Sequence, residues 1–154
     1  MEQSIQIIEY QTIYKEDFKK INVEWIEKFF KIEPHDLEQL DAPEEIINNG
    51  GQIFLAKLGD EIVGTSALIH DGDDIYELAK MGVTPKAQGL GLGKKLCIFS
   101  IEEAKKRNAK SLYLLSNRKL IPAITMYSNL GFVEVPIGAT LYERTDIKMD
   151  YPLQ

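Results

Sequence analysis

The sequence predicts a mixed α/β domain, in which about four helices flank a central twisted sheet of about seven strands. Short apolar runs of strand length alternate with segments whose apolar residues recur every three or four positions. Two of the apolar runs are joined by a glycine-rich loop and a helical segment, a connection typical of parallel strands. No repeat or linker divides the 154 residues, so we expect one domain over residues 1–154.

The N-terminal third predicts one strand and two helices. Residues 4–10 alternate imperfectly between apolar and polar side chains, as a half-buried strand does. Residues 17–31 have the apolar spacing of an amphipathic helix, and we expect Pro34 to limit its extension. A second, short helix is expected from Pro43 and is closed by Gly50 and its glycine neighbour.

The middle of the chain predicts a three-stranded meander. Residues 52–57 and 61–69 are apolar runs separated by the turn sequence LGDE, which favours a β-hairpin. The sequence DGDD at residues 71–74 is a second turn signal. We therefore expect a third strand over residues 75–83.

The C-terminal part predicts two helices and three strands. A helix with one apolar side follows the glycines near residue 90, and a buried strand is expected at 111–116. Pro122 opens another helix, which stops at Gly131. The remaining residues, 132–151, are expected to form two strands around the turn sequence PIGA.

Composition favours an ordinary soluble protein. Hydrophobic residues make up 44% of the chain and charged residues 27%, and the net charge is −6. This acidity argues against a nucleic-acid partner and gives a weak bias toward cationic small molecules. The chain shows no leader pattern and no apolar stretch of membrane-spanning length, and its single cysteine, Cys97, cannot form an internal disulfide. We expect a cytoplasmic protein without a membrane partner.

Three glycines at alternate positions, Gly89, Gly91 and Gly93, lie between an expected strand and an expected helix. A loop at that place presents backbone N–H groups beside the positive end of the helix dipole, and side chains there would block a phosphate. We therefore expect a phosphate-bearing ligand. The spacing fits neither GxGxxG nor GxxxxGK[ST]. A simple chain-reversing turn remains the alternative, and nucleoside triphosphate binding ranks behind both.

Three stretches resemble the GNAT superfamily of acyl-CoA-dependent N-acetyltransferases. Residues 88–93, QGLGLG, fit the family pattern Q/R-x-x-G-x-G/A. Residues 77–85 resemble the family's fourth strand, and residues 122–132 resemble its fourth helix with the turn that follows. All three occur in the family's order, and the expected elements cover nearly the whole chain.

The resemblance implies a GNAT fold whose fourth and fifth strands splay apart around acetyl-CoA. The pantetheine arm would pair with the backbone of Met81 and Val83, and Gly82 is the expected place of the bulge that causes the splay. Many relatives carry Asn where this chain has Leu120, and Asn117 is a candidate replacement in cofactor binding. The pyrophosphate would be held by Gln88, Gly89, Leu90, Gly91, Leu92, Gly93 and Lys94.

The same resemblance implies direct transfer of an acetyl group to a primary amine of a small molecule or peptide. Tyr127 matches the family's tyrosine that protonates the departing thiolate, and Glu77 matches a frequent glutamate that serves as base, directly or through water. A buried Cys97 makes an acetyl-cysteine route improbable. The alternative is a catalytically silent acyl-CoA sensor of the same fold.

Acceptor specificity is the least determined feature of the sequence. By analogy of fold, the segments that border the acceptor site contain Trp25, Phe29, Glu33 and Tyr142, and Glu33, His35 and Asp36 are expected to face a substrate amine. Neither His35 nor His70 has partners at metal-ligand spacing, so no metal is expected. The oligomeric state stays open, with a homodimer as the commonest assembly of soluble proteins.

Overall fold

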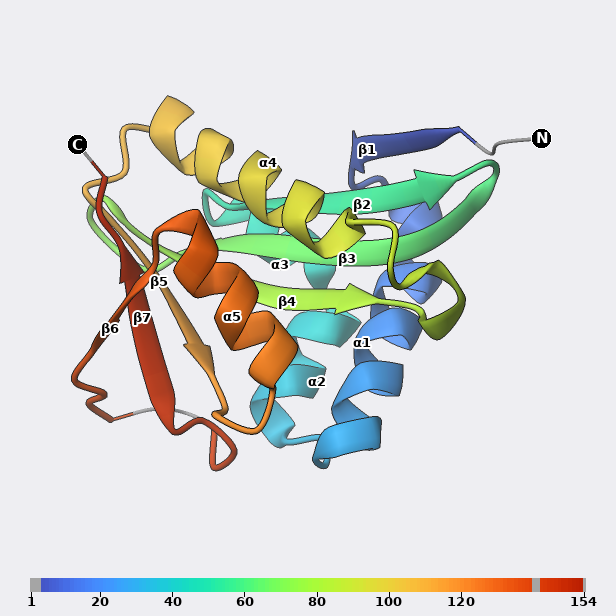
Figure 1. Cartoon of the computed structure of the whole chain (residues 1–154). Helices are drawn as coiled ribbons and strands as arrows, with labels where there is room; N and C mark the ends of the chain where they lie inside the picture. The colour runs from blue at the N-terminus through green and yellow to red at the C-terminus, as the bar shows by residue number, and fades with distance from the viewer. Residues whose placement is uncertain (1–3, 140–141, 154) are drawn as a thin grey trace.

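A mixed seven-stranded sheet is the centre of the structure, a computed structural model that describes residues 4–139 and 142–153. The strand order is β1-β2-β3-β4-β5-β7-β6, in which β4 and β5 are parallel and the other neighbours are antiparallel (Figure 1). The strands are β1 (Ile5–Glu9), β2 (Gln52–Leu58), β3 (Glu61–His70), β4 (Ile75–Val83), β5 (Ser111–Ser116), β6 (Val133–Val135) and β7 (Ile147–Tyr151). The predicted fold class and sheet size are confirmed.

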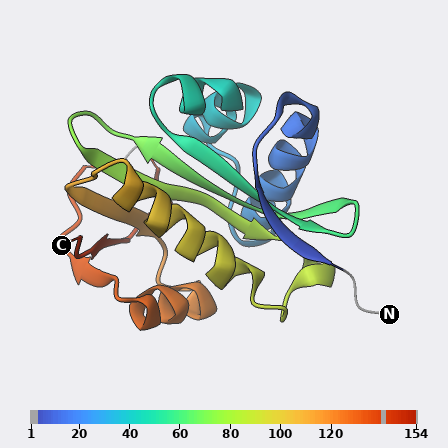
Figure 2. The same ribbon diagram turned by 90° about the horizontal axis from the view of Figure 1, so that it is seen from above.

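Helices cover both faces of this sheet, so the molecule has three layers (Figures 1 and 2). One face carries α4 and α5, whose apolar residues pack on β4, β5 and β7. The other face carries the three N-terminal helices, which pack on β2 and β3. The helices are α1 (Lys15–Phe29), α2 (Pro34–Asp41), α3 (Pro43–Asn48), α4 (Leu92–Lys106) and α5 (Ile121–Leu130).

One helix more than expected lies in the connection after α1. Pro34 does not merely limit the preceding helix but opens α2 at its first turn, where a missing N–H is harmless. The Glu33 side chain accepts from the N–H of Asp36, and the Asp36 carboxylate accepts from the N–H of Glu33 at 2.9 Å. The sequence E-P-H-D departs from the usual S/T-x-x-E/Q pattern of a capping box, so this reciprocal cap was not predicted.

The end of the chain differs from the expected short hairpin. The two last strands form, but residues 136–146 separate them, so PIGA is the start of a longer connection rather than the whole turn. Within this connection, Tyr142 donates a hydrogen bond to Gln39 and Arg144 donates one to Asp36. Both acceptors belong to α2, which covers the sheet face opposite to α4 and α5. The sequence contained turn signals in this connection, but no pattern that indicated its contact with α2.

Candidate functional site

β4 and β5 are paired only over the first four residues of each strand and then separate. Their parallel pairing runs from Ile75↔Ser111 to Leu78↔Leu114, while β4 continues to Val83. The divergence is visible in Figure 1, where α5 lies in front of the opening. Beyond Leu78, β4 keeps its partner β3 and presents its other edge toward the opening. An extended ligand can pair with such an edge as an added strand would.

A bulge in β4 accompanies the divergence, at Lys80 and Met81 rather than at the expected Gly82. Register with β3 passes from Ala67↔Ala79 to Thr65↔Gly82, so two β4 residues oppose one β3 residue. Lys80 takes a left-handed φ of 53°, which costs a non-glycine residue about 1 to 2 kcal/mol. The Thr65 hydroxyl donates to the Lys80 carbonyl at 2.7 Å and stabilises this turn of the backbone.

Gly82 is needed for a different reason. A Cβ atom at this position would lie 2.4 Å from Cδ1 of Trp25, which is closer than real contacts allow. The Trp25 indole N–H donates to Asn22 at 2.9 Å, which fixes the ring over β4. The absent side chain therefore lets α1 bring an aromatic wall against the diverging strand.

A groove of about 410 Å³ occupies the space between the separated strands. Its walls come from α1, the end of β4, the end of β5 and the first turns of α5. The groove is lined by Trp25, Phe29, Leu78, Ala79, Lys80, Met81, Gly82, Val83, Gln88, Leu114, Leu115, Ser116, Lys119, Leu120, Pro122, Ala123 and Tyr127. Most of this surface is apolar, which suits a slender organic ligand.

The glycine loop directly follows Gln88, which lines the groove. Gly89 and Gly91 have left-handed φ angles of 86° and 76°, and Gly91 caps the N-terminus of α4. Within the described residues, the N–H groups of residues 89–94 have no backbone acceptor, and the first such bond of α4 runs from Lys95 to Gly91. These amides are thus open to an external acceptor. The Gln88 side chain is not free in the same way, because it donates to the Val83 carbonyl at 3.2 Å.

Tyr127 borders the groove from α5. Its ring is buried against Phe132, with ring centroids 5.7 Å apart. Burial raises the pKa of the hydroxyl well above its ordinary value, so the group stays protonated at neutral pH. A protonated phenol beside a groove can donate a hydrogen bond or a proton to a ligand there.

Glu77 lines a smaller cavity of about 60 Å³ that adjoins the groove. The two spaces share Trp25, Ala79, Lys80, Leu115, Ser116 and Leu120 as lining residues. Burial raises the pKa of Glu77 to about 7, and the nearby charges of Lys80, Asp71 and Lys148 modify it. A carboxylate with this pKa can take up and release a proton near neutral pH.

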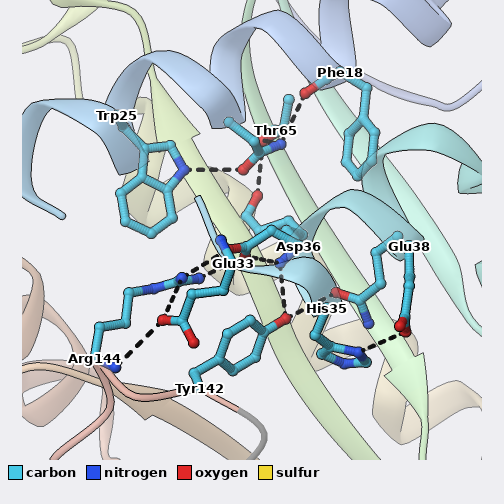
Figure 3. A network of polar contacts seen from close by, with 12 residues as sticks. Phe18, Trp25, Glu33, His35, Asp36, Glu38, Thr65, Tyr142 and Arg144 are labelled. Carbon is cyan, nitrogen blue, oxygen red and sulfur yellow. Dashed lines mark hydrogen bonds and ion pairs between the residues drawn. The ribbon is translucent and has the colours of Figure 1, made fainter. Parts of the chain in front are cut away.

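Lys80, Tyr142 and Arg144, which line the cavity, belong to a network of polar contacts around Asp36. Figure 3 shows Asp36, Tyr142 and Arg144 of this network. Arg144 donates to both carboxylate oxygens of Asp36 at 2.7 Å, and Lys80 donates to Asp36 at 3.1 Å. Lys80 also donates to the Tyr142 hydroxyl at 3.0 Å. Although burial alone would raise it, the hydrogen bonds from Arg144 and the charge of Lys80 lower the pKa of Asp36 to about 2.

Some of the predicted acceptor-site residues line the groove or the cavity, and the others stabilise α2 and its contacts. Trp25 lines both spaces, Phe29 lines the groove, and Tyr142 lines the cavity. Glu33 lines neither space. Its carboxylate caps α2 and accepts a hydrogen bond from the Glu143 N–H at 2.8 Å, so it holds the segment that contains Tyr142 against α2. Asp36 was expected to face a substrate amine and is instead fully buried in the ion-pair network.

Asn117 lies at the cavity rather than in the groove. Its side-chain N–H donates to the Arg144 carbonyl at 2.7 Å, and its side-chain oxygen accepts from the Lys119 N–H at 2.9 Å. The amide thus ties the loop after β5 to the loop before β7. Leu120, at the position where relatives carry Asn, lines both spaces.

Sequence reasoning missed the two basic residues of the cavity. Lys80 stands between apolar residues of an expected strand, and a cation in such a place needs a partner. That signal was available, but its partners Asp36 and Tyr142 lie 44 and 62 positions away. Arg144 carried no signal, since it lies in the irregular connection between β6 and β7.

In residues 4–139 and 142–153, no group of three or more His, Cys, Asp or Glu side chains is placed to hold a metal ion. Over the same ranges no helix is both long and apolar enough to cross a bilayer.

Sequence comparison relates the chain to known acetyltransferases. Residues 12–132 match the acetyltransferase (GNAT) family. An uncharacterised N-acetyltransferase of Escherichia coli, YjgM, is 34% identical over 88 residues, which are 56% of this chain and 53% of that protein. A mycothiol acetyltransferase of Thermomonospora curvata is 31% identical over 85 residues, or 55% of this chain and 29% of that protein. The matched segment thus spans about half or less of these curated relatives.

Comparison with solved structures covers nearly the whole chain. A GNAT-family acetyltransferase of Staphylococcus aureus Mu50 superposes with a TM-score of 0.88 at 31% identity, covering 98% of this chain and 100% of that one. An acetyltransferase of Salmonella typhimurium, yncA, solved with acetyl-CoA, shares the fold with a TM-score of 0.78 at 17% identity, covering 98% and 95%.

Proposed function

Because the chain belongs to the GNAT acetyltransferase family, we propose that it transfers the acetyl group of acetyl-CoA to a primary amine of a small molecule or peptide. The observation that carries this proposal is the divergence of β4 and β5 after Leu78↔Leu114. It makes a groove that extends to Gln88, next in sequence to the unpaired amides of residues 89–94, passes Tyr127 and adjoins a cavity containing Glu77. Residues 1–154 act as one catalytic domain in this proposal.

The groove suits the cosubstrate at each end. The N–H groups of residues 89–94 and the α4 dipole favour a diphosphate. The free edge of β4 at Met81 and Val83 favours the amides of a pantetheine arm. When bound, acetyl-CoA supplies the acetyl group as a thioester. The cavity at Glu77 then accommodates the amine.

The reaction requires the amine to lose a proton and the departing sulfur to gain one. A primary amine is mostly protonated at neutral pH and must lose a proton before its nitrogen can bond to the acetyl carbon. Glu77 accepts that proton, directly or through water, because its pKa of about 7 lets it be ionised and still basic. As the C–S bond breaks, Tyr127 donates a proton to the sulfur and regains one from solvent.

The proposal is tested by following free thiol while the protein is mixed with acetyl-CoA and a panel of amines. We expect thiol release that depends on the amine, with an equal amount of N-acetylated amine detected by mass spectrometry. Tight binding of acetyl-CoA without amine-dependent thiol release on any acceptor would instead indicate a silent acyl-CoA-binding protein.

A further inference from the structure

We propose that the acceptor is a primary amine whose amine-bearing carbon carries no carboxylate, so that amines and amino-acid amides are used and free α-amino acids are excluded. This inference rests on the proposed function, since it concerns the cavity where the amine would bind. The inference depends on two observations: which charged side chains line the cavity, and which of these already have a partner in the protein.

Glu77 offers the cavity an unpaired negative charge. Among the described lining residues it is the only acidic one, and within the described chain its carboxylate takes part in no hydrogen bond or ion pair. An ammonium group entering the cavity would pair with this carboxylate. A ligand carboxylate on the adjacent carbon would be brought close to the same negative charge, which is unfavourable.

The two basic residues of the cavity cannot compensate for that repulsion without breaking buried pairs. Arg144 binds both oxygens of Asp36 at 2.7 Å and one oxygen of Glu33 at 3.2 Å. Lys80 binds Asp36 and Tyr142. The side chains of Lys80 and Asp36 are 3% and 0% exposed, so separating them would leave an unpaired charge in the interior. Among the described residues that line the cavity, a substrate carboxylate therefore meets no available cation.

The remaining walls favour a slender carbon skeleton. Trp25, Phe30, Leu115 and Leu120 contribute apolar surface to a cavity of only about 60 Å³. The indole N–H of Trp25 is already bonded to Asn22, so its ring offers carbon to the cavity. A narrow space that combines this apolar surface with the carboxylate of Glu77 is matched by an alkylammonium group.

The test compares acceptors that differ in one group. Isoamylamine, leucinamide and leucine share a skeleton and carry hydrogen, a neutral carboxamide or a carboxylate on the amine-bearing carbon. We expect kcat/KM for isoamylamine to exceed that for leucine at least tenfold, with leucinamide above leucine. Phenethylamine, phenylalaninamide and phenylalanine form a second set with a wider skeleton and the same expected order.

Variants of the network test the cause. In Asp36→Asn the charges of Lys80 and Arg144 lose their carboxylate partner, so the preference for isoamylamine over leucine should fall. Glu33→Gln, which frees Arg144 only in part, should act in the same direction and serves where the first variant does not fold. A preference that neither folded variant changes would overturn the inference.

The outcomes separate the two proposals. Leucine used as well as isoamylamine, or leucinamide as poor as leucine, would overturn the charge argument while leaving the acetyltransferase assignment intact. Absence of thiol release with every member of both sets, and with the wider amine panel, would overturn the proposed function and this inference together.

Discussion

The ammonium of Lys80 lies 3.1 Å from the carboxylate of Asp36, and this buried pair joins the bulge of β4 to α2. Arg144 brings the loop before β7 to the same carboxylate. One acidic side chain therefore fixes three segments that are far apart in the sequence. It also keeps two positive charges paired beside Glu77, where a cationic amine is expected to bind.

Asp36→Asn is expected to lower the free energy of unfolding by about 3 to 5 kcal/mol, because it leaves two cations in the interior without their partner. Urea unfolding followed by circular dichroism measures this. Asp41→Asn, at the exposed end of α2, is the matched control, since its ion pair with Lys19 lies at the surface and should contribute about 1 kcal/mol or less. Equal effects of the two variants would show that the buried network is not a main source of stability.

The contribution of Asp36 should disappear in acid. Its folded pKa of about 2 lies below the ordinary value of 3.8, so its stabilising effect is present above about pH 4 and is lost as the pH falls through about 2. The difference in unfolding free energy between the wild-type protein and Asp36→Asn should therefore shrink over this interval. A difference that stays constant down to pH 2 would contradict the assignment.

If Glu77 is the base, the pH dependence of kcat/KM should show a fall below about pH 7, because the protonated carboxyl cannot accept the proton of the amine. Glu77→Gln should lower the rate and remove this fall. Glu38→Gln, on the exposed face of α2, should retain both rate and profile. A Glu77→Gln enzyme with an unchanged profile would exclude Glu77 from the proton transfer.

Tyr127→Phe should reduce kcat about 100-fold while leaving the affinity for acetyl-CoA nearly unchanged. The reason is that only the proton donor to the sulfur is removed. Within the described residues the hydroxyl has no hydrogen-bond partner, so the variant should fold as stably as the parent. Steady-state kinetics and calorimetric binding measure the two effects. Unchanged turnover would remove Tyr127 from the mechanism.

Gly91→Val should abolish or severely weaken acetyl-CoA binding, because a branched side chain would enter the space in front of the open amides. Gly72→Val is a close control. Gly72 has the same φ of 76° and equally open surroundings, but it lies in the turn between β3 and β4. Both variants should lose about 1 to 2 kcal/mol of stability from backbone strain. Equal loss of cosubstrate affinity in both would contradict the role of the loop.

The sequence predicted the elements that depend on local patterns. Strands at 75–83 and 111–116 and the helix from Pro122 to Gly131 were recognisable from apolar runs, proline and glycine. The splay followed from the resemblance to a family and is confirmed by the register of β4 and β5. The bulge was misplaced by one to two residues, because glycine is a common cause of bulges but Lys80 is stabilised there by Thr65.

The acceptor site was much less predictable. Glu77 and Trp25 were expected there, but Lys80, Asp36 and Arg144 meet through contacts that span 44 to 108 positions. Such contacts leave no periodic or spacing signal in a single sequence. Only the folded chain therefore shows whether a charged residue is paired within the protein or available to a ligand. The inference about the acceptor depends on this distinction.

The most direct measurement is a crystal structure of the protein with coenzyme A. The account predicts that the diphosphate accepts hydrogen bonds from the amides of residues 89–94, that the pantetheine arm lies between β4 and β5, and that the thiol lies within hydrogen-bond reach of the Tyr127 hydroxyl. Coenzyme A bound elsewhere, or β4 and β5 closed together along their full length in the complex, would contradict it.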